Sequence, residues 1–247
     1  MPDPLIPATV AFRADGTPYS PRYNDIYHSA VGSLAQAQYV FLQGNGLPGR
    51  WQQQRTFTVL EIGFGMGVNF LTTWAAWRAD SGRCERLHFV SIEKHPFSAS
   101  DLRRAYAATI DDQSIAALAE TLAAEWPALA PGIHQLVFEG GSVTLTLVFC
   151  DAADALPGLR LRADAFYLDG FAPAKNPEIW TPAIFESLAC LASDGATFAT
   201  YTSAGSVKRA LLQAGFQYRK APGFGWKRAM LVGQIPSSST RLQPLCE

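Results

Sequence analysis

Four hydrophobic segments of the sequence each end at or beside an acidic residue. If these segments are neighbouring parallel strands, their carboxyl ends meet at one edge of a sheet, which is where open α/β sheets bind ligands. Carboxylates there accept hydrogen bonds from hydroxyl groups and amines. A carboxylate after the second strand accepts from both hydroxyls of a ribose. The four residues are Glu61 in "TFTVLEI", Glu93 after "LHFVSI", Asp151 after "TLTLVFC" and Asp169 after "AFYL".

A glycine-rich stretch, Glu61-Ile62-Gly63-Phe64-Gly65-Met66-Gly67, joins the first of these strands to a predicted helix. Glycines allow a tight turn and a close approach to a ligand, and the following helix begins with free N–H groups. Val68 stands where the dinucleotide fingerprint G-x-G-x-x-G has its last glycine. The spacing therefore favours S-adenosylmethionine over NAD or FAD. A glycine turn without a ligand stays an alternative.

The stretch "YLDGFAPAKNPEIW", residues 167–180, places a carboxylate, an aromatic ring and prolines directly after a strand. Pro173 and Pro177 fix their φ angles and so restrict the loop. Taken alone, the pattern fits a clamp for a ligand about as well as a plain strand-to-helix turn in which Asp169 caps the helix.

The elements that must position these residues alternate along the chain. Apolar strands separated by helices are typical of a parallel sheet covered on both faces, so we expect a doubly wound α/β fold. The Gly-Gly turn at Gly140 and Gly141 predicts a hairpin, and the last two strands predict an antiparallel edge. Strands are expected at 56–62, 87–92, 165–169 and 196–202. Helices are expected at 68–78, 177–192 and 204–214, and one from 98 into the 110s is followed by a further helical stretch that ends at 126.

Three parts of the chain differ in pattern. Residues 1–50 are expected to form a small N-terminal appendage, because they combine short alternating pieces with aromatic and glycine-rich turns. Residues 51–235 are expected to form the ligand-binding domain. Residues 236–247 include "PSSST" and have the composition of a tail or linker.

Composition narrows the class of protein. Apolar residues make up 48% of the 247 residues and charged residues 17%, and no segment resembles a membrane span or a secretory signal. The sequence therefore predicts a cytoplasmic protein without a membrane partner. The four cysteines and four histidines lack metal-ligand spacing, so no metal site is expected.

Positive charge is concentrated near the end of the chain, although the net charge is only −1. From Ser203 to Gln234 the sequence contains no Asp or Glu, which predicts a local positive field. An ordinary solvated face explains the charges equally well until another feature indicates a polyanion. The cations of this segment are Lys208, Arg209, Arg219, Lys220, Lys227 and Arg228.

Several motifs together resemble one family. They are "EIGFGMGVNFL", "LHFVSIEK", "YLDGFAPAKNPEIWT", "TFATYTSAGSVKRALLQAGF" and "GFGWKRAML", with "GTP", "DIY" and "YVFLQGN" in the first 50 residues. The chain resembles, over nearly its whole length, the methyltransferase half of the bifunctional tRNA 5-methylaminomethyl-2-thiouridine biosynthesis enzymes (MnmC), also found as a stand-alone form, MnmD. The "LDGFAPAKNP" stretch is the most particular of these motifs.

The resemblance implies a class I, Rossmann-like fold that uses S-adenosyl-L-methionine, without a metal or FAD in this chain. It implies methylation of 5-aminomethyl-2-thiouridine to 5-methylaminomethyl-2-thiouridine at the wobble position of tRNA. The residues expected to bind the cofactor are Glu61, Gly63, Phe64, Gly65, Gly67, Asn69, Glu93, Lys94 and Asp151.

The resemblance also implies roles in catalysis and RNA binding. Asp169 is expected to hold the amine and to take up its proton, Phe171 to stack on the uracil, and Pro173 to keep the loop rigid. Binding of a tRNA anticodon stem-loop is assigned to Lys175, Lys208, Arg209, Lys227 and Arg228. The FAD-dependent oxidase half is expected as a separate partner or as a missing C-terminal domain. A small-molecule amine methyltransferase and a non-catalytic nucleotide- or RNA-binding module stay open as alternatives.

Four positions depart from the family pattern. Met66 stands where Thr is common, and His95 stands where Phe is usual. Trp226 and Ala229 replace a basic and an acidic residue, so no role is assigned to either position.

Overall fold

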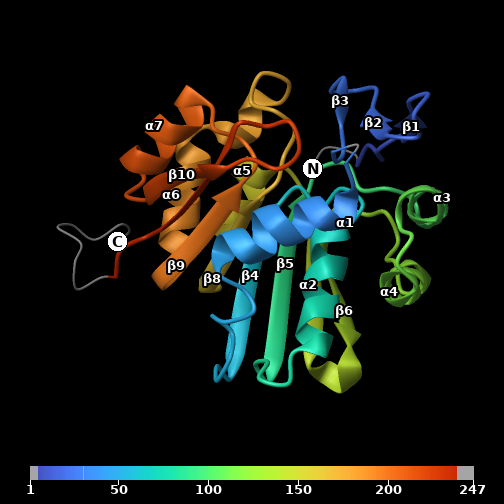
Figure 1. The fold of residues 1–247 in the computed structure, drawn as a ribbon, viewed down its shortest axis with the longest axis horizontal. Coiled ribbons are helices and arrows are strands. Elements are labelled where there is room, and N and C mark those ends of the chain that lie inside the picture. The colour runs from blue at the N-terminus through green and yellow to red at the C-terminus, as the bar shows by residue number, and fades with distance from the viewer. Residues whose placement is uncertain (1–4, 30, 238–247) are drawn as a thin grey trace.

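The protein is built around one eight-stranded sheet, seen in a computed structural model that describes residues 5–29 and 31–237. The strand order is β10-β11-β9-β8-β4-β5-β7-β6 (Figure 1). Strands β4, β5, β7, β8 and β9 run parallel to their neighbours within this group. The bounds are β4 Thr56–Ile62, β5 Arg86–Glu93, β6 Gly132–Phe138, β7 Val143–Phe149, β8 Ala163–Leu168, β9 Ala192–Thr200, β10 Gln217–Pro222 and β11 Ala229–Gln234.

Both edges of the sheet are antiparallel, as the sequence predicts. The Gly140–Gly141 turn joins β6 to β7 in an antiparallel pair, and β11 pairs antiparallel with both β9 and β10. The expected doubly wound α/β class is therefore confirmed. One helix differs from the prediction. The segment 177–192, expected as one helix, is a short 3₁₀ turn, Pro177–Trp180, followed by α6. Pro182 takes the first position of α6, where a backbone N–H would have no partner within the helix.

Helices cover both faces of the sheet because the side chains of each central strand alternate between them. In β4, Phe57 and Val59 belong to one hydrophobic cluster, with side chains of α2, α3 and α4. Leu60 and Ile62 belong to the other, with side chains of α6 and α7. The helices are α2 Val68–Ala79, α3 Ala99–Thr109, α4 Gln113–Ala124, α5 Ala152–Ala155, α6 Pro182–Leu191 and α7 Gly205–Gln213.

The first 53 residues contain two different parts. Strands β1 Ala11–Phe12, β2 Pro18–Ser20 and β3 Asp25–Ile26 form a separate small antiparallel sheet. The helical segment that follows, α1 Ser33–Gln36 with its continuation to Asn45, lies across the large sheet in front of β4, β5 and α2 (Figure 1). Phe41 in this segment is fully buried, and its ring lies 5.4 Å from that of Tyr167. The helical segment is therefore part of the main core.

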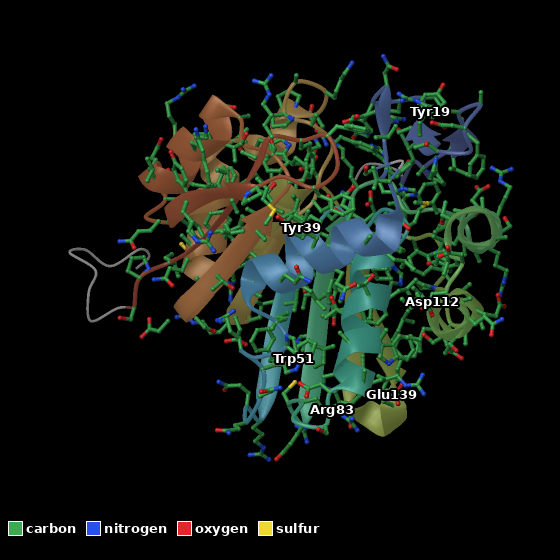
Figure 2. The ribbon with its side chains drawn as sticks, in the orientation of Figure 1. Tyr19, Tyr39, Trp51, Arg83, Asp112 and Glu139 are labelled. Carbon is green, nitrogen blue, oxygen red and sulfur yellow. The ribbon has the colours of Figure 1, made fainter. Side chains whose placement is uncertain are left out.

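A second contact joins the end of this region to the sheet. Trp51, labelled in Figure 2, is fully buried. Its indole N–H donates to Oδ2 of Asp80, at the end of α2, at 2.8 Å. The proposed division into residues 1–50 and 51–235 stays a prediction, and residues 238–247 of the proposed tail lie outside the described ranges.

Replacing Phe41 with Ala tests whether the helical segment shares the core of the sheet. Loss of a fully buried aromatic ring is expected to lower the free energy of unfolding by about 3–5 kcal/mol. Leu212→Ala is the control, because Leu212 is 57% exposed on α7, and it is expected to stay within about 0.5 kcal/mol of the parent. Urea denaturation measures both. Equal, small effects would show that the segment is not part of the core.

Candidate functional site

A cavity of about 680 Å³ opens at the carboxyl ends of β4, β5, β7 and β8, the edge predicted from the acidic residues. The helical segment after β3, the small sheet and the loop between β10 and β11 also contribute to its walls. Ten of the residues expected at the site line it: Gly63, Phe64, Gly65, Asn69, Glu93, Lys94, Asp151, Asp169, Phe171 and Lys227.

The glycine turn after β4 positions the backbone within the cavity. Gly63 has φ +91°, and a Cβ at this position would collide with the carbonyl oxygen of Asp169. Only glycine therefore lets the ends of β4 and β8 approach this closely. The N–H of Gly65 donates to Glu93 Oε2 at 2.9 Å, and the N–H of His95 donates to Oε1 at 2.7 Å. Both oxygens of Glu93 are thereby held in place, and each keeps a lone pair for a hydroxyl group.

Asn69, at the start of α2, connects two carboxyl groups. Its Nδ2 donates to Glu61 Oε1 at 2.8 Å and to Asp169 Oδ2 at 2.7 Å. Glu61 also accepts from Ser91 Oγ at 2.6 Å. Glu61 is fully buried and is not among the residues that line the cavity, so its predicted role in cofactor binding stays a prediction. It acts on the site by fixing Asn69.

Asp169 is half-buried and lines the cavity. Desolvation raises the pKa of Asp169 to about 7, against the opposing effects of the Asn69 hydrogen bond and the positive charge of Lys227. Burial likewise raises the pKa of Glu61 well above its ordinary value. A carboxyl group with a pKa near neutrality is suited to accept a proton from an amine.

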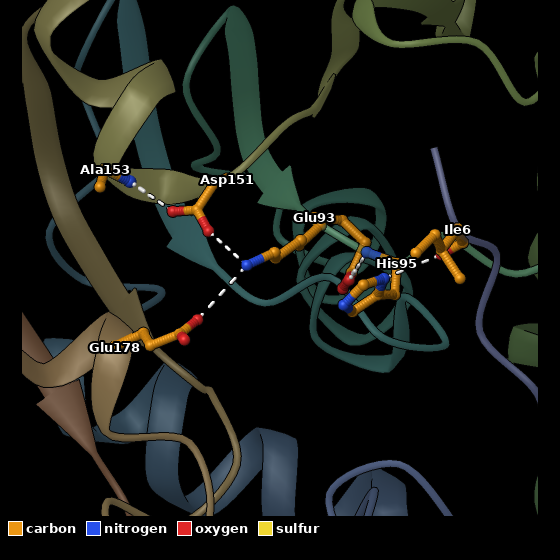
Figure 3. Close-up of polar contacts among 7 residues, drawn as sticks. Ile6, Glu93, His95, Asp151, Ala153 and Glu178 are labelled. Atoms are coloured by element: carbon orange, nitrogen blue, oxygen red, sulfur yellow. Dashed lines mark hydrogen bonds and ion pairs between the residues drawn. The ribbon is translucent and has the colours of Figure 1, made fainter. Parts of the chain in front are cut away.

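Lys94 joins two acidic residues of the cavity wall, Asp151 and Glu178. Its Nζ lies 2.6 Å from Asp151 Oδ2 and 3.3 Å from Glu178 Oε2, while the N–H of Ala153 donates to Asp151 Oδ1 at 2.9 Å (Figure 3). Burial on its own raises the pKa of Asp151, but the Lys94 contact and the Ala153 N–H outweigh it together, so the pKa is lowered. Asp151 therefore stays charged, and its position is set by both neighbours.

Aromatic rings form the wall around Phe171. The ring of Tyr23 stacks on it with centroids 4.6 Å apart, and Tyr27 meets it edge-on at 5.2 Å. Asp25 Oδ2 accepts from the N–H of Ala172 at 2.9 Å, which ties β3 to the loop after β8. Tyr23 covers one face of Phe171, so only the remaining surface of this ring is open to the cavity.

Tyr201 and Lys227 complete the wall next to Asp169. The hydroxyl of Tyr201 donates to the carbonyl of Gly170 at 2.7 Å, and Lys227 Nζ lies 4.1 Å from the centre of the Tyr201 ring. Burial lowers the pKa of Lys227, and the charges of Asp25 and Asp169 oppose this shift. The ammonium group is thus close enough to act on the charge of Asp169.

Several expected site residues lie outside the cavity lining. Gly67 caps α2 and packs against the Phe64 ring, Pro173 and Lys175 lie in the turn beyond Phe171, and Lys208 and Arg209 lie on α7. Arg228 follows Lys227 but also stays outside. Conversely, the cavity lining includes five residues that the sequence did not predict at the site: Tyr23, Asp25, Tyr27, Tyr201 and Trp226. The aromatic-rich "YNDIY" was the available signal for the first three.

The donor set fits S-adenosyl-L-methionine. A turn that admits only glycine, free N–H groups at the start of α2, and the fixed Glu93 carboxylate suit a nucleoside with a charged tail. Among the described residues, no group of three or more His, Cys, Asp and Glu is arranged to hold a metal ion. In the same ranges, every helix is too short or too polar to cross a lipid bilayer.

Known proteins are similar to this chain. It is 73% identical over 95% of its length to "tRNA 5-methylaminomethyl-2-thiouridine biosynthesis bifunctional protein MnmC" of Paraburkholderia xenovorans, and 64% identical over 95% to the protein of that name from Burkholderia thailandensis. In both comparisons the chain spans 36% of the relative's length.

The fold is similar to that in the crystal structure of MNMC2 from Aquifex aeolicus, with a TM-score of 0.74 and 24% identity. That match covers 94% of this chain and 72% of the other. The model of a family described as S-adenosyl-L-methionine-dependent methyltransferases matches residues 113–236, half of the chain. With the cavity geometry, this match shows that the chain belongs to the S-adenosyl-L-methionine-dependent methyltransferases.

Proposed function

We propose that the protein methylates the amine of 5-aminomethyl-2-thiouridine at the wobble position of tRNA, giving 5-methylaminomethyl-2-thiouridine. The observation that carries the proposal is the placement of Asp169 in the same cavity as the Gly63–Gly65 turn and Glu93. The substrate comes from the printed name of relatives up to 73% identical to this chain. Incubation of tRNA carrying the unmethylated amine with labelled S-adenosyl-L-methionine tests it, and absence of label on the wobble uridine would refute it.

S-adenosyl-L-methionine supplies a methyl group on a positively charged sulfur, and the attacking amine must be neutral. Because little covalent chemistry is left to the protein, positioning dominates. We assign the ribose to Glu93, whose oxygens are already fixed by two N–H groups. We assign the glycine turn, Phe64, Asn69, Lys94 and Asp151 to the rest of the cofactor, with Glu61 acting through Asn69.

Asp169 is the proposed proton acceptor. The hydrogen bond from Asn69 to Oδ2 leaves Oδ1 for the substrate amine. The ionised carboxylate takes a proton from the ammonium form of the substrate, which frees the lone pair for attack. Phe171 with Tyr23 offers an aromatic contact for the uracil ring, and Pro173 restricts the loop between them and α6.

The tRNA anticodon stem-loop is the proposed macromolecular partner. Lys227 lies in the cavity wall, and Lys175, Lys208, Arg209 and Arg228 lie outside it, where they are available for phosphates. The relatives are longer and are named bifunctional, so we propose that an FAD-dependent oxidase acts with this chain as a partner or further domain. We propose a cytoplasmic location, which fits a tRNA substrate.

A small-molecule amine methyltransferase is the second candidate, since a glycine turn and a carboxylate serve any amine acceptor. The two candidates differ in their salt dependence. Contacts to phosphates make RNA affinity fall steeply as salt rises, whereas a free amine would show little change. A non-catalytic binding module is a third candidate, for which loss of Asp169 would change nothing measurable.

Asp169→Asn is expected to lower kcat by about 10²- to 10⁴-fold, because the amide cannot accept the proton. Affinity for S-adenosyl-L-methionine, measured by calorimetry, should change by no more than a few-fold, since Asn keeps the size of the side chain and can accept from Asn69. Asp111→Asn, on the exposed loop before α4, is the control and should keep full activity. Unchanged turnover in Asp169→Asn would exclude the proposed role.

The pH dependence of kcat/KM separates a proton acceptor from a group that only orients the amine. The pKa of Asp169 is about 7. If Asp169 accepts the proton, kcat/KM should rise tenfold per pH unit below about pH 7 and then level off. An orienting carboxylate with a neutral amine would instead give a profile that keeps rising above pH 7.

Lys227→Met is the matched variant for this profile. The positive charge of Lys227 lowers the pKa of Asp169, so its removal should move the rising limb to higher pH. A limb that stays in place would show that another group titrates.

A further inference from the structure

The loop between β10 and β11 contains a tight turn, residues 223–228, which we call the Trp226 turn. The N–H of Lys227 donates to the carbonyl of Phe224 at 3.2 Å, and Gly225 has φ +60°. A Cβ at Gly223 would collide with the carbonyl of Lys227. The backbone of this turn is therefore closely folded on itself, and its shape depends on glycine at both positions.

Side chains on either side of Trp226 are anchored to the body of the protein. The ring of Phe224 lies 5.9 Å from that of Tyr39, whose hydroxyl donates to the carbonyl of Pro222 at 3.1 Å. On the other side, Lys227 lies over the Tyr201 ring. The indole of Trp226 lies between these two anchors and packs against neither, because the residue is 92% exposed.

Such exposure of a large aromatic side chain calls for an explanation. Of the large hydrophobic residues in the described ranges, Trp226 is the most exposed, and Ile133 follows at 67%. Indole rings are usually covered, because they bury a large apolar area together with one polar N–H. Here a folded turn keeps the indole ring exposed to solvent. An exposed ring on a fixed backbone is suited to contact a ligand.

The ligand must reach the catalytic cavity, because Trp226 and Asp169 line the same cavity. The connection is short: Lys227 lies on Tyr201, and Tyr201 donates to Gly170, the neighbour of Asp169. Trp226 thus lies on the acceptor side of the site, at the loop that follows β8. A protein domain seated on Trp226 would close the entry for the acceptor, so we favour the acceptor itself as the occupant.

The charge around the Trp226 turn identifies the chemistry of the occupant. Lys227 and Arg228 follow Trp226 directly, and no acidic residue occurs in the sequence from Ser203 to Gln234. Asp25 and Asp169 act on the charge of Lys227 from the cavity side, so the exposed Arg228 is the cation more available to a phosphate. Flat rings with neighbouring negative charges are found in single-stranded nucleic acid, whose bases stack on exposed aromatic side chains while phosphates contact the cations.

We propose that Trp226 stacks on the base next to the wobble uridine in the anticodon loop, while the uridine enters the cavity. This inference rests on the proposed function and adds a contact outside the reacting nucleotide. The contact between Trp226 and this base holds the RNA in place when the wobble uridine turns out of the anticodon loop. Arg228 and Lys227 contact the adjoining phosphates.

Binding of anticodon stem-loop RNAs, measured by fluorescence anisotropy, tests the proposal. Trp226→Ala should weaken binding by about 5- to 150-fold, the range of a lost base stack. Trp226→Phe should retain most of the affinity, and Trp226→Lys should not, because it supplies a charge without a ring. Leu212→Ala, an equally simple truncation of an exposed side chain on α7, should bind as the parent does.

Stem-loops that lack one base on either side of the wobble nucleotide locate the contact. The parent protein should lose affinity for one of these RNAs, and Trp226→Ala should bind that RNA no more weakly than the intact one. Equal losses for parent and variant would overturn the proposal, as would an unchanged affinity of Trp226→Ala for intact RNA. A comparable loss of S-adenosyl-L-methionine affinity in Trp226→Ala would also overturn it, since the ring would then serve the cofactor.

Methyl transfer by the parent protein distinguishes this inference from the proposed function. If the parent methylates the tRNA but Trp226→Ala binds and reacts normally, only the stacking contact is wrong. If the parent neither binds nor methylates the tRNA, the proposed function fails and the stacking contact fails with it.

Discussion

The site depends on one side-chain amide. Asn69 donates to Glu61 and to Asp169 from the same nitrogen, and so joins a fully buried carboxyl group below the sheet edge to one that faces the cavity. Two carboxylates this close in a region poor in water repel each other, and desolvation disfavours the charged form of each. The hydrogen bonds from Asn69 and Ser91 reduce that cost. Without this arrangement, neither the direction of Asp169 nor its near-neutral pKa would be maintained.

Around Asn69, the cavity has one polar wall and one aromatic wall. On the side of β5 and β7, backbone N–H groups and ion pairs fix Glu93 and Asp151, so polar groups there are held before any ligand binds. On the side of β3 and β8, rings of Tyr23, Tyr27 and Phe171 pack on one another. Hydrogen bonds orient a polar cofactor, whereas aromatic surface suits a planar base.

The sequence predicted most of the large sheet because its central strands β4, β5, β7 and β8 are largely apolar and several of its turns are marked by glycine. The central strands, the hairpin at Gly140 and the antiparallel edge follow from local pattern alone. Asp169 and Glu93 were found for the same reason, since each follows a strand directly. Glu61 also lies near a strand end, but its side chain is fully buried, which the local pattern does not show.

The remaining parts of the site depend on contacts between distant segments. Nothing local shows that Asp25 meets Ala172, or that Lys227 meets Tyr201 beside Asp169. The short alternating pieces and turns of residues 1–50 predict an appendage, and this division stays a prediction; they do not show that Phe41 packs on Tyr167. Such pairings arise from tertiary packing, which a single sequence does not display.

The bond between Asp25 and Ala172 has a consequence for biosynthesis of the chain. Residues near the start and residues near position 227 line a single cavity, and the central sheet lies between them in sequence. The ribosome must synthesise nearly the whole described chain before the early and the late parts of the cavity wall are both present. The complete cavity wall is therefore available only after the residues near position 227 have been synthesised.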